Sequence, residues 1–380
     1  MIVRHFIQWL RTAAAGARAD ATSALARAYL YSDLSPDDRA AAEGAMLMLL
    51  DDPSPLVRGA LADALANSPD APATIIFALS EDKPEIAAIV LERSPLLLDA
   101  DLVDRVGSGC VVCQAAIGRR QNLPCAVAAA LAEVGSAEAC LILIENPAAA
   151  IPLFSLGRIV ERHGHLAAIR EALLTHDDLP PCTRQALVAK LSQTLASFVT
   201  AQSWLEAGRA HRIAREACEQ ATVALAAEMP QPDVRPLVTH LRRSGQLTPG
   251  LLLRALLSGN VLLFEEALAE LSGLPLARVA GLVHDRRGKG ISALLAQAGI
   301  PASTVPAIRA AVDALQEIGT AGEFGGATRL KRRMVERVLT SCEHKERCPE
   351  TEALLVLLRR FASEAARDEA RRFCDELEAA

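Results

Sequence analysis

The chain has 380 residues, of which 51% are hydrophobic and only 3% aromatic, and its formal net charge at pH 7 is −6. The large hydrophobic share excludes a wholly disordered protein. Because strand-favouring aromatic residues are scarce while Ala and Leu favour helices, the composition also argues against an all-β sandwich or barrel.

The same inventory disfavours three further classes of protein. No run of about 18 uncharged apolar residues is present, so we expect no membrane-spanning helix. The mild excess of acidic residues gives no reason to expect nucleic-acid binding. Nine cysteines at irregular spacing fit a reducing compartment better than a disulfide framework, so we predict a cytoplasmic location.

Residues 1–50 are predicted to form two or three amphipathic helices that cap the next part of the chain. The first stretch, Met1–Leu10, carries charges among its apolar residues and lacks a convincing cleavage site, so we expect an amphipathic helix rather than a signal peptide. Ser35 followed by Pro36 is a strong helix start, because Ser can accept a capping hydrogen bond and Pro suits the first helical position.

A 26-residue repeat is the most informative feature of the sequence. The unit is too short for a βαβ crossover but fits two short helices and two turns, which must stack on their neighbours to bury an apolar face. We predict a helical-repeat domain over residues 51–200, closed by helices at 166–174 and 181–199. The residues that recur on this period are Leu65, Leu91, Ile117 and Leu143, which we expect to be equivalent and buried; Pro69, Pro95 and Pro147; and Ile76, Leu102, Ala128 and Phe154.

Two resemblances accompany the repeat. The stretch Asp52-Pro-Ser-Pro-Leu-Val-Arg resembles the leucine-rich-repeat variant and the related HEAT-like repeats, in which an Asp-Pro turn precedes a Val-Arg-containing helix. The whole chain is similar to an uncharacterised family of bacterial proteins that carry such repeats before a second helical domain. That similarity lies in residues 244–256, 263–269 and 298–301. It implies an all-α fold, and it implies no activity, cofactor or partner.

The second half is predicted to contain a helical domain over residues 201–320 and a linker with a helical tail over residues 321–380. The domain begins with a long helix, Trp204 to about Glu228. The glycine-rich stretch 319–326 is the linker candidate. The last helix carries an apolar stripe that needs a cover, either the body of the protein or a second copy in a homodimer. The stripe consists of Leu354, Leu355, Leu358, Phe361 and Ala365.

Cys110-Val-Val-Cys113, with Cys125 and Cys140 downstream, could supply four thiolates to zinc or an iron–sulfur cluster. The repeat argues against this, because Cys113 and Cys140 fall in slots that other units fill mainly with alanine. Cysteine in such a slot acts as a small buried hydrophobe. We therefore predict neither a metal nor a cofactor. The corresponding residues are Leu61, Ala87 and Ala139 for Cys113, and Ala62 and Ala88 for Cys140.

Two basic segments could bind anions or phosphoryl groups. Arg286, Arg287 and Lys289 lie in a glycine-bearing loop before a helix start, where backbone amides attract anions. The loop lacks the order of a nucleotide phosphate-binding loop, so an exposed turn is the simpler interpretation. His211 and His240 lie near arginines and could accept a phosphoryl group, but a solvated helix face explains both more simply.

These observations favour a non-enzymatic cytoplasmic protein that acts as an interaction or regulatory scaffold, because helical-repeat stacks usually bind other proteins. The expected partner is a protein, not nucleic acid. The alternative is a signalling switch or a redox or metal sensor that uses His211 or the Cys110–Cys113 pair. The third hypothesis is an enzyme with a site between domains, which ranks last because no catalytic constellation is visible in the sequence.

Overall fold

The computed structural model of the chain describes residues 9, 12–176, 179–285, 290–320, 327–343 and 349–378. Across these ranges it contains 21 helices and no strand, which confirms the predicted all-α fold class. The helices fall into two compact units, Met1–Leu179 and Pro180–Ala380. None of the described helices is both long enough and apolar enough to cross a membrane.

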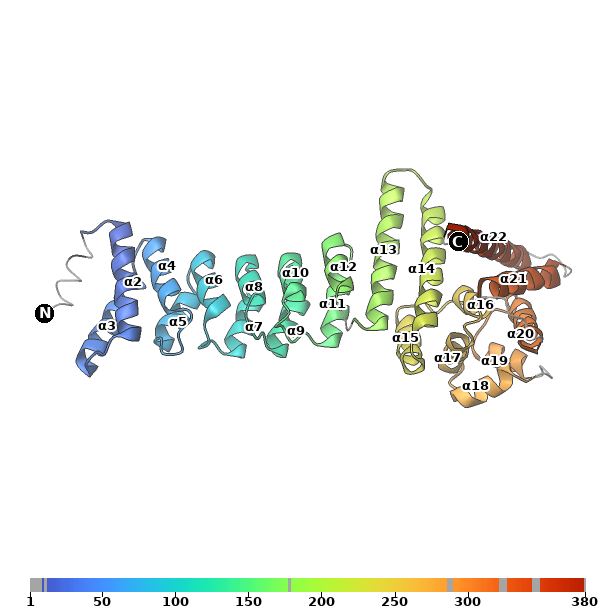
Figure 1. Cartoon of the computed structure of the whole chain (residues 1–380), viewed down its shortest axis with the longest axis horizontal. Coiled ribbons are helices and arrows are strands. Elements are labelled where there is room, and N and C mark those ends of the chain that lie inside the picture. Colours follow the sequence, from blue (N-terminus) through green and yellow to red (C-terminus); the bar gives the residue numbers. More distant parts are fainter. Residues whose placement is uncertain are drawn as a thin grey trace. The chain divides into compact units, whose positions relative to one another are not determined.

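Unit 1 is a succession of short helices (Figure 1). Their bounds are α2 (Ala15–Tyr31), α3 (Pro36–Leu49), α4 (Pro55–Leu65), α5 (Ala73–Ser80), α6 (Pro84–Arg93), α7 (Asp99–Gly107), α8 (Val111–Gly118), α9 (Cys125–Val134), α10 (Ala137–Glu145), α11 (Leu153–His163) and α12 (Ala167–Leu174). The predicted helix start at Ser35 is confirmed, since its side chain accepts a hydrogen bond from the Asp38 amide.

The helices of unit 1 pack in two rows. In one row α4 packs against α6, α6 against α8, α8 against α10 and α10 against α12. In the other row α7 packs against α9 and α9 against α11, while α2 packs against α4 at the N-terminal side. The four positions predicted to be equivalent all have less than 1% of their surface exposed, so that prediction is confirmed. They are Leu65 in α4, Leu91 in α6, Ile117 in α8 and Leu143 in α10.

The second recurring position fails at the last unit. Ile76, Leu102 and Ala128 are buried, but Phe154 is 73% exposed. The cause is the helix start. Helices α5, α7 and α9 begin at residues 73, 99 and 125, which are 26 apart, whereas α11 begins 28 residues after α9. The two-residue step moves Phe154 to the exposed second position of its helix and puts Leu156 into the core.

Neighbouring repeat units are also joined by side chains that donate hydrogen bonds to the carboxyl ends of the preceding helices. Arg120, after α8, donates to the Leu91 and Ser94 carbonyls at the end of α6. Arg162 of α11 donates to the carbonyls of residues 132 and 135 at the end of α9, both at 2.8 Å. The Asn146 amide donates to the Gly118 carbonyl at the end of α8 at 2.8 Å.

The Asp-Pro turn of the first repeat unit is held by ion pairs. Arg18 of α2 pairs with Asp52 at 2.8 Å, and Arg58 of α4 pairs with Asp82 at 2.6 Å. The Arg58 guanidinium also donates to the backbone carbonyl of Asp52. The hydrogen bond from the partner arginine lowers the pKa of each of the two aspartates below its usual value. The segment that carries the resemblance to leucine-rich-repeat variants thus also carries a chain of paired charges.

Unit 2 begins earlier than the boundary at residue 200 that the sequence suggests. Helix α13, which the sequence assigns to the closing end of the repeat domain, packs mainly against α14 and also against α15, so it belongs to unit 2. The helices of unit 2 are α13 (Pro181–Ala201), α14 (Ala207–Glu228), α15 (Gln231–Arg243), α16 (Pro249–Leu257), α17 (Val261–Ser272), α18 (Leu276–Val283), α19 (Ile291–Gln297), α20 (Val305–Thr320), α21 (Ala327–Glu343) and α22 (Pro349–Glu378).

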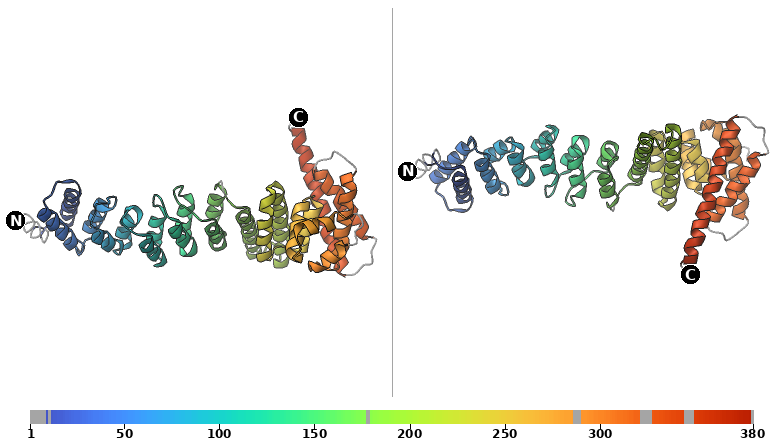
Figure 2. Two further views of the ribbon diagram at one scale, coloured as in Figure 1. Left: turned by 90° about the horizontal axis from the view of Figure 1, so that it is seen from below. Right: turned by 90° about the horizontal axis from the view of Figure 1, so that it is seen from above.

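The predicted tail is part of the core of unit 2. Leu354, Leu358 and Phe361 of α22 are buried in one cluster with residues of α16 and α20, and α22 packs against α21. Its own chain therefore covers the apolar stripe, as one of the two predicted alternatives requires. The last turns of α22 extend beyond the other helices of unit 2 (Figure 2). Residues 321–326, most of the predicted linker, lie outside the described residues.

Charged groups fasten α22 to the body of unit 2. The Arg254 guanidinium of α16 lies 2.6 Å from Glu364 and 4.3 Å from the centre of the Phe361 ring. Lys331 of α21 pairs with Glu364 and Asp368, each at 2.9 Å. Because Arg254 is only 3% exposed, its charge depends on these α22 partners for compensation.

We expect Leu91→Ala to destabilise unit 1 by about 2–5 kcal/mol, since it leaves a cavity in the repeat core. Leu98→Ala removes a side chain that is 69% exposed and should change the free energy of unfolding by about 0.5 kcal/mol or less. Urea unfolding of both variants checks the prediction. Equal effects of the two substitutions would contradict the assignment of Leu91 to the core.

Two phenylalanines on α22 give a matched test of the tail. Phe361 is 3% exposed and Phe373 is 61% exposed. Phe361→Ala should lower the stability of unit 2 by about 3–5 kcal/mol, whereas Phe373→Ala should be nearly neutral. Thermal unfolding followed by circular dichroism measures both. If Phe361→Ala unfolds like the parent, α22 does not contribute to the core.

Candidate functional site: the α13–α14 hairpin and its pocket

Helices α13 and α14 form an antiparallel hairpin whose connecting turn points away from α15–α20 (Figure 1). The seam between the two helices is built from small residues, including the buried Ala189, Ala196 and Ala210. Glu206 starts α14 by accepting hydrogen bonds from the amides of Gly208 and Arg209, at 2.8 and 2.9 Å. Because alanines fill the seam, the larger apolar side chains of the hairpin are not needed inside it.

Those larger side chains lie on the surface and form what we call the hairpin stripe. Leu191, Leu195 and Phe198 follow one another at positions i, i+4 and i+7, so they share one face of α13. The Phe198 and Trp204 rings pack edge to face with their centres 5.6 Å apart. The exposed fractions are 39% for Leu191, 53% for Leu195, 51% for Phe198, 67% for Trp204 and 46% for Ile213.

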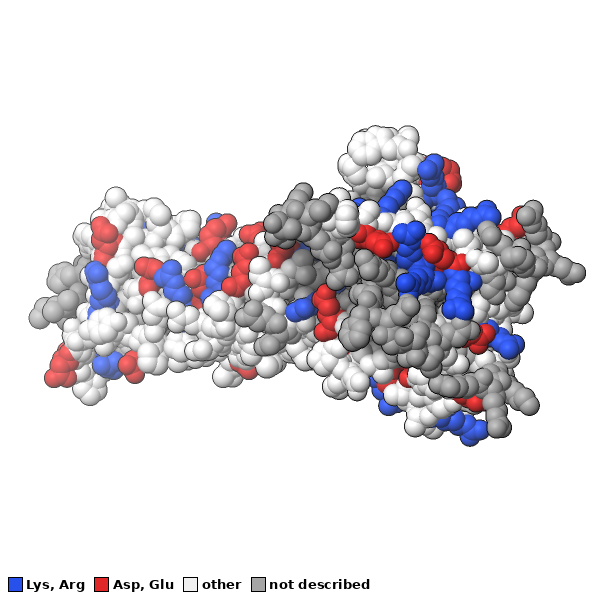
Figure 3. All heavy atoms as spheres, turned by 45° about the vertical axis from the view of Figure 1, so that its right-hand side comes forward, with Lys and Arg blue, Asp and Glu red and all other residues white. Residues whose placement is uncertain are grey.

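Three arginines line α14 on the same hairpin, and we call them the arginine row. Arg209, Arg212 and Arg215 are exposed and spaced three residues apart, and none makes an ion pair with any residue that the structure describes. In Figure 3 the top of the hairpin is largely uncharged surface, with Lys and Arg side chains gathered beside and below it. The hairpin thus combines an uncovered apolar stripe with uncompensated positive charge.

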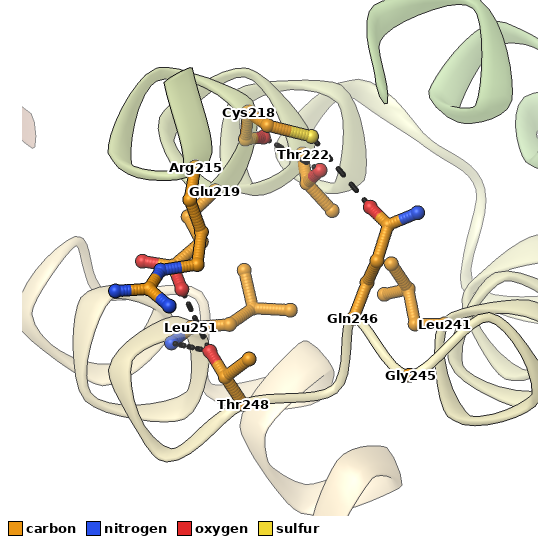
Figure 4. A pocket seen from close by; sticks show the side chains of 9 residues that line it. All are labelled: Arg215, Cys218, Glu219, Thr222, Leu241, Gly245, Gln246, Thr248 and Leu251. Atoms are coloured by element: carbon orange, nitrogen blue, oxygen red, sulfur yellow. Dashed lines mark hydrogen bonds between the residues drawn. The ribbon is translucent and has the colours of Figure 1, made fainter. Parts of the chain in front are cut away.

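A small polar pocket lies at the base of the hairpin, where α14 meets α15, α16 and the turn between them (Figure 4). Its volume is about 80 Å³, enough for a few water molecules or part of a small ligand. Arg215, the last member of the arginine row, is at its edge. The other lining residues are Cys218, Glu219, Thr222, Leu241, Gly245, Gln246, Thr248 and Leu251.

Glu219 is the buried acid of this pocket. Its carboxylate accepts a hydrogen bond from the Thr248 hydroxyl at 2.7 Å, and Thr248 in turn accepts from the Leu251 amide and caps α16. Burial raises the pKa of Glu219 above its usual value, although Thr248 and the charges of Arg254 and Arg215 oppose that effect.

Neutral polar groups form the opposite wall. Gln185 of α13 is fully buried, and its amide donates to the Gln246 carbonyl oxygen at 2.6 Å. Its own carbonyl oxygen lies 3.1 Å from His240 Nε2, which must therefore carry a proton and donate. Burial lowers the pKa of His240 and raises that of the Cys218 thiol, so both groups are held neutral.

The remaining residues singled out in the sequence are spread over the two units. His211 is exposed on α14, with Nδ1 2.7 Å from the Ala207 carbonyl oxygen. Cys113 and Cys140 are buried, as their repeat slots predict, while Cys125 is exposed. No group of three or more His, Cys, Asp or Glu side chains suited to a metal occurs among the described residues. The anion loop of Arg286, Arg287 and Lys289 lies outside the described residues.

Sequence reasoning overlooks both the hairpin stripe and the pocket. The spacing of Leu191, Leu195 and Phe198 is visible in the sequence, but it reads equally well as the core face of a repeat helix. Gln185 and Glu219 carry no signal at all, because a polar residue on a helix is normally exposed. Only the packing of α13, α14 and the α15–α16 turn brings these side chains together.

A family model described as "Uncharacterised protein conserved in bacteria (DUF2336)" matches residues 86–347, well over half of the chain. The chain belongs to this family. The DUF2336 match includes the hairpin, the pocket and most of unit 2. No curated protein and no solved structure matches the chain. The resemblance of the first repeat unit to leucine-rich-repeat variants therefore rests on its own residues alone.

Glu219→Gln should leave the free energy of unfolding equal or higher at pH 7. Because burial raises the folded-state pKa of Glu219, the ionised form opposes folding, and stability from this group is lost as pH rises through that pKa. The variant keeps an acceptor for Thr248 and removes the charge, so its advantage should disappear as pH falls below about 4.3. Urea unfolding across pH measures the difference. Glu228→Gln, on the exposed surface of the same helix, is the control, and equal behaviour of the two variants would contradict the burial of Glu219.

Proposed function

We propose that this protein is a non-enzymatic interaction protein and that the α13–α14 hairpin is its docking surface for a partner protein. The observation that carries the proposal is the hairpin stripe, in which three large apolar residues at i, i+4 and i+7 are about half exposed while alanines fill the seam. That spacing is the one an amphipathic partner helix uses when it lies along a groove. Two exposed aromatic rings at the end of the stripe fit the enrichment of aromatics in interfaces.

The charge of the hairpin defines the chemistry of the partner. The arginine row leaves three positive charges beside the stripe without an ion pair among the described residues. A partner helix with acidic residues flanking its apolar face would pair with Arg209, Arg212 and Arg215 and be steered to the site. A second copy of the hairpin would bring like charges together, which disfavours a homodimer through this surface. We therefore propose an acidic amphipathic helix as the ligand.

Location and repeat type belong to the same proposal. We propose that the protein acts in the cytoplasm, because its nine cysteines are irregularly spaced and suit a reducing compartment. Unit 1, as a stack of paired helices of the leucine-rich-repeat-variant or HEAT-like kind, would act as a scaffold that presents its own surface next to the docked partner.

Binding of a labelled helical peptide tests the proposal. The probe carries Leu at i, i+4 and i+7 flanked by Glu, and its twin carries Lys in place of Glu. We expect the Glu peptide to bind, with an affinity that falls as salt rises. Phe198→Asp should weaken binding at least about tenfold, since it places a charge in the centre of the apolar contact. Trp204 fluorescence in a Trp9→Phe background gives a second readout of the same surface.

Two controls make the result specific. Phe154→Asp changes an equally exposed phenylalanine of unit 1 and should leave binding unchanged. Arg209→Glu combined with Arg212→Glu should reverse the preference from the Glu peptide to the Lys peptide. Undiminished binding by Phe198→Asp would refute the hairpin as the docking surface. A stable dimer of the parent protein that Leu195→Asp dissociates would assign the stripe to a second copy instead.

A further inference from the structure

The two cysteines at the start of α8 occupy unequal positions. Cys110 is the residue that precedes the helix, with an extended backbone of φ −71° and ψ 111°, and its side chain is partly exposed. Cys113 lies in the first turn of the helix and is 1% exposed. Their side chains interact directly. The pair therefore presents one accessible sulfur with a second, enclosed sulfur behind it.

The surroundings of the two thiols differ in the same sense. Partial burial raises the pKa of Cys110, but the amides of Cys113 and Val112, the Cys113 side chain and the charge of Arg105 more than offset it, so the pKa lies below the usual value. Burial, together with Cys110, raises the pKa of Cys113 to about 11. An accessible thiolate at a helix N-terminus is the usual environment of a reactive cysteine.

Access to the pair is open from the side of the helix start. Val111 and Val112, the two residues between the cysteines, are 44% and 47% exposed. A reagent can therefore approach Cys110 over a short apolar rim. Cys140 provides the contrast, because it is fully buried, burial raises its pKa to about 11, and its thiol contacts only the backbone carbonyls of Leu131 and Gly135. It has the chemistry of a packing residue.

We propose that Cys110 and Cys113 form a redox-active dithiol that exchanges with a small-molecule disulfide. The Cys110 thiolate attacks one sulfur of the substrate disulfide, whose S–S bond breaks and releases one thiolate that takes up a proton. Cys113 then loses its proton and attacks Cys110 Sγ, which releases the second thiol. The protein gains one S–S bond and loses two S–H bonds, while the substrate disulfide is reduced to two thiols. This activity lies in unit 1 and is independent of docking on the hairpin.

The backbone permits the product. Side chains one turn apart on a helix have their Cβ atoms about 5–6 Å apart, and a disulfide needs roughly 3.5–4.5 Å. Since Cys110 lies outside the helix with a non-helical backbone, it can move toward Cys113 without breaking the hydrogen bonds of α8. Helix-start Cys-x-x-Cys pairs with one lowered thiol pKa behave in this way in disulfide exchange.

The test uses the full-length protein equilibrated with glutathione and glutathione disulfide at a series of ratios, quenched with acid and alkylated. Mass spectrometry of the intact chain and its peptides then locates each sulfur. We expect the oxidised protein to lose two alkylation sites and to contain a Cys110–Cys113 peptide that lacks two hydrogens. The rate of alkylation of Cys110 should rise with pH with a midpoint below that of an ordinary thiol, about 8.5.

Variants separate the two steps. Cys113→Ala should stop at a mixed disulfide of glutathione on Cys110, and it should fold because Ala87 and Ala139 occupy the same slot in other units. Cys110→Ser should form neither product, and Cys125→Ser should leave the Cys110–Cys113 disulfide unchanged. The proposal is overturned if wild-type protein keeps both thiols alkylatable at the most oxidising ratio, or if it accumulates glutathione on Cys110 without closing the disulfide. Wild-type mapping decides the matter even if a variant fails to fold.

Discussion

The structure of unit 1 depends on one constraint of short helices, which is that their last four carbonyls have no partner within the helix. For α8, which has eight residues, that is about half of the helix. Arg120, Arg162 and Asn146 meet this need from the following repeat unit, where each donates to carbonyls at the end of a preceding helix. A unit therefore completes its own hydrogen bonding only when its neighbour is in place. Burial of Leu65, Leu91, Ile117 and Leu143 provides the apolar part of the same dependence.

Much of this could be read from the sequence because the signals are local and periodic. The 26-residue recurrence of Leu91 and its equivalents predicts both helical pairs and burial, and the alanine slots predict that Cys113 and Cys140 are packing positions. The period misleads at Phe154, because a two-residue displacement of α11 leaves no obvious mark in a chain so rich in alanine and leucine. The donors Arg120 and Asn146 carry no recognisable motif, since their partners are backbone atoms.

The candidate sites were less predictable because they depend on what a residue does not touch. Leu195 and Phe198 look like core residues by spacing, and they are exposed only because Ala196 and Ala210 already close the seam. Gln185 becomes a pocket residue through contacts with His240 and Gln246, which are 55 and 61 residues away. The Cys110–Cys113 pair was visible in the sequence, yet the difference between its two thiols arises from the backbone at the start of α8.

The delayed start of α11 has a consequence for how this chain can change length. Helices α5, α7 and α9 share one register, so insertion or loss of 26 residues among them preserves every contact between neighbours. The step of 28 residues before α11 breaks that equivalence. Helices α11 and α12 cannot replace an interior pair, and an interior pair placed after α10 would present its apolar positions two residues out of phase. The displacement therefore acts as a terminus written into the register, which fixes where growth by duplication must stop.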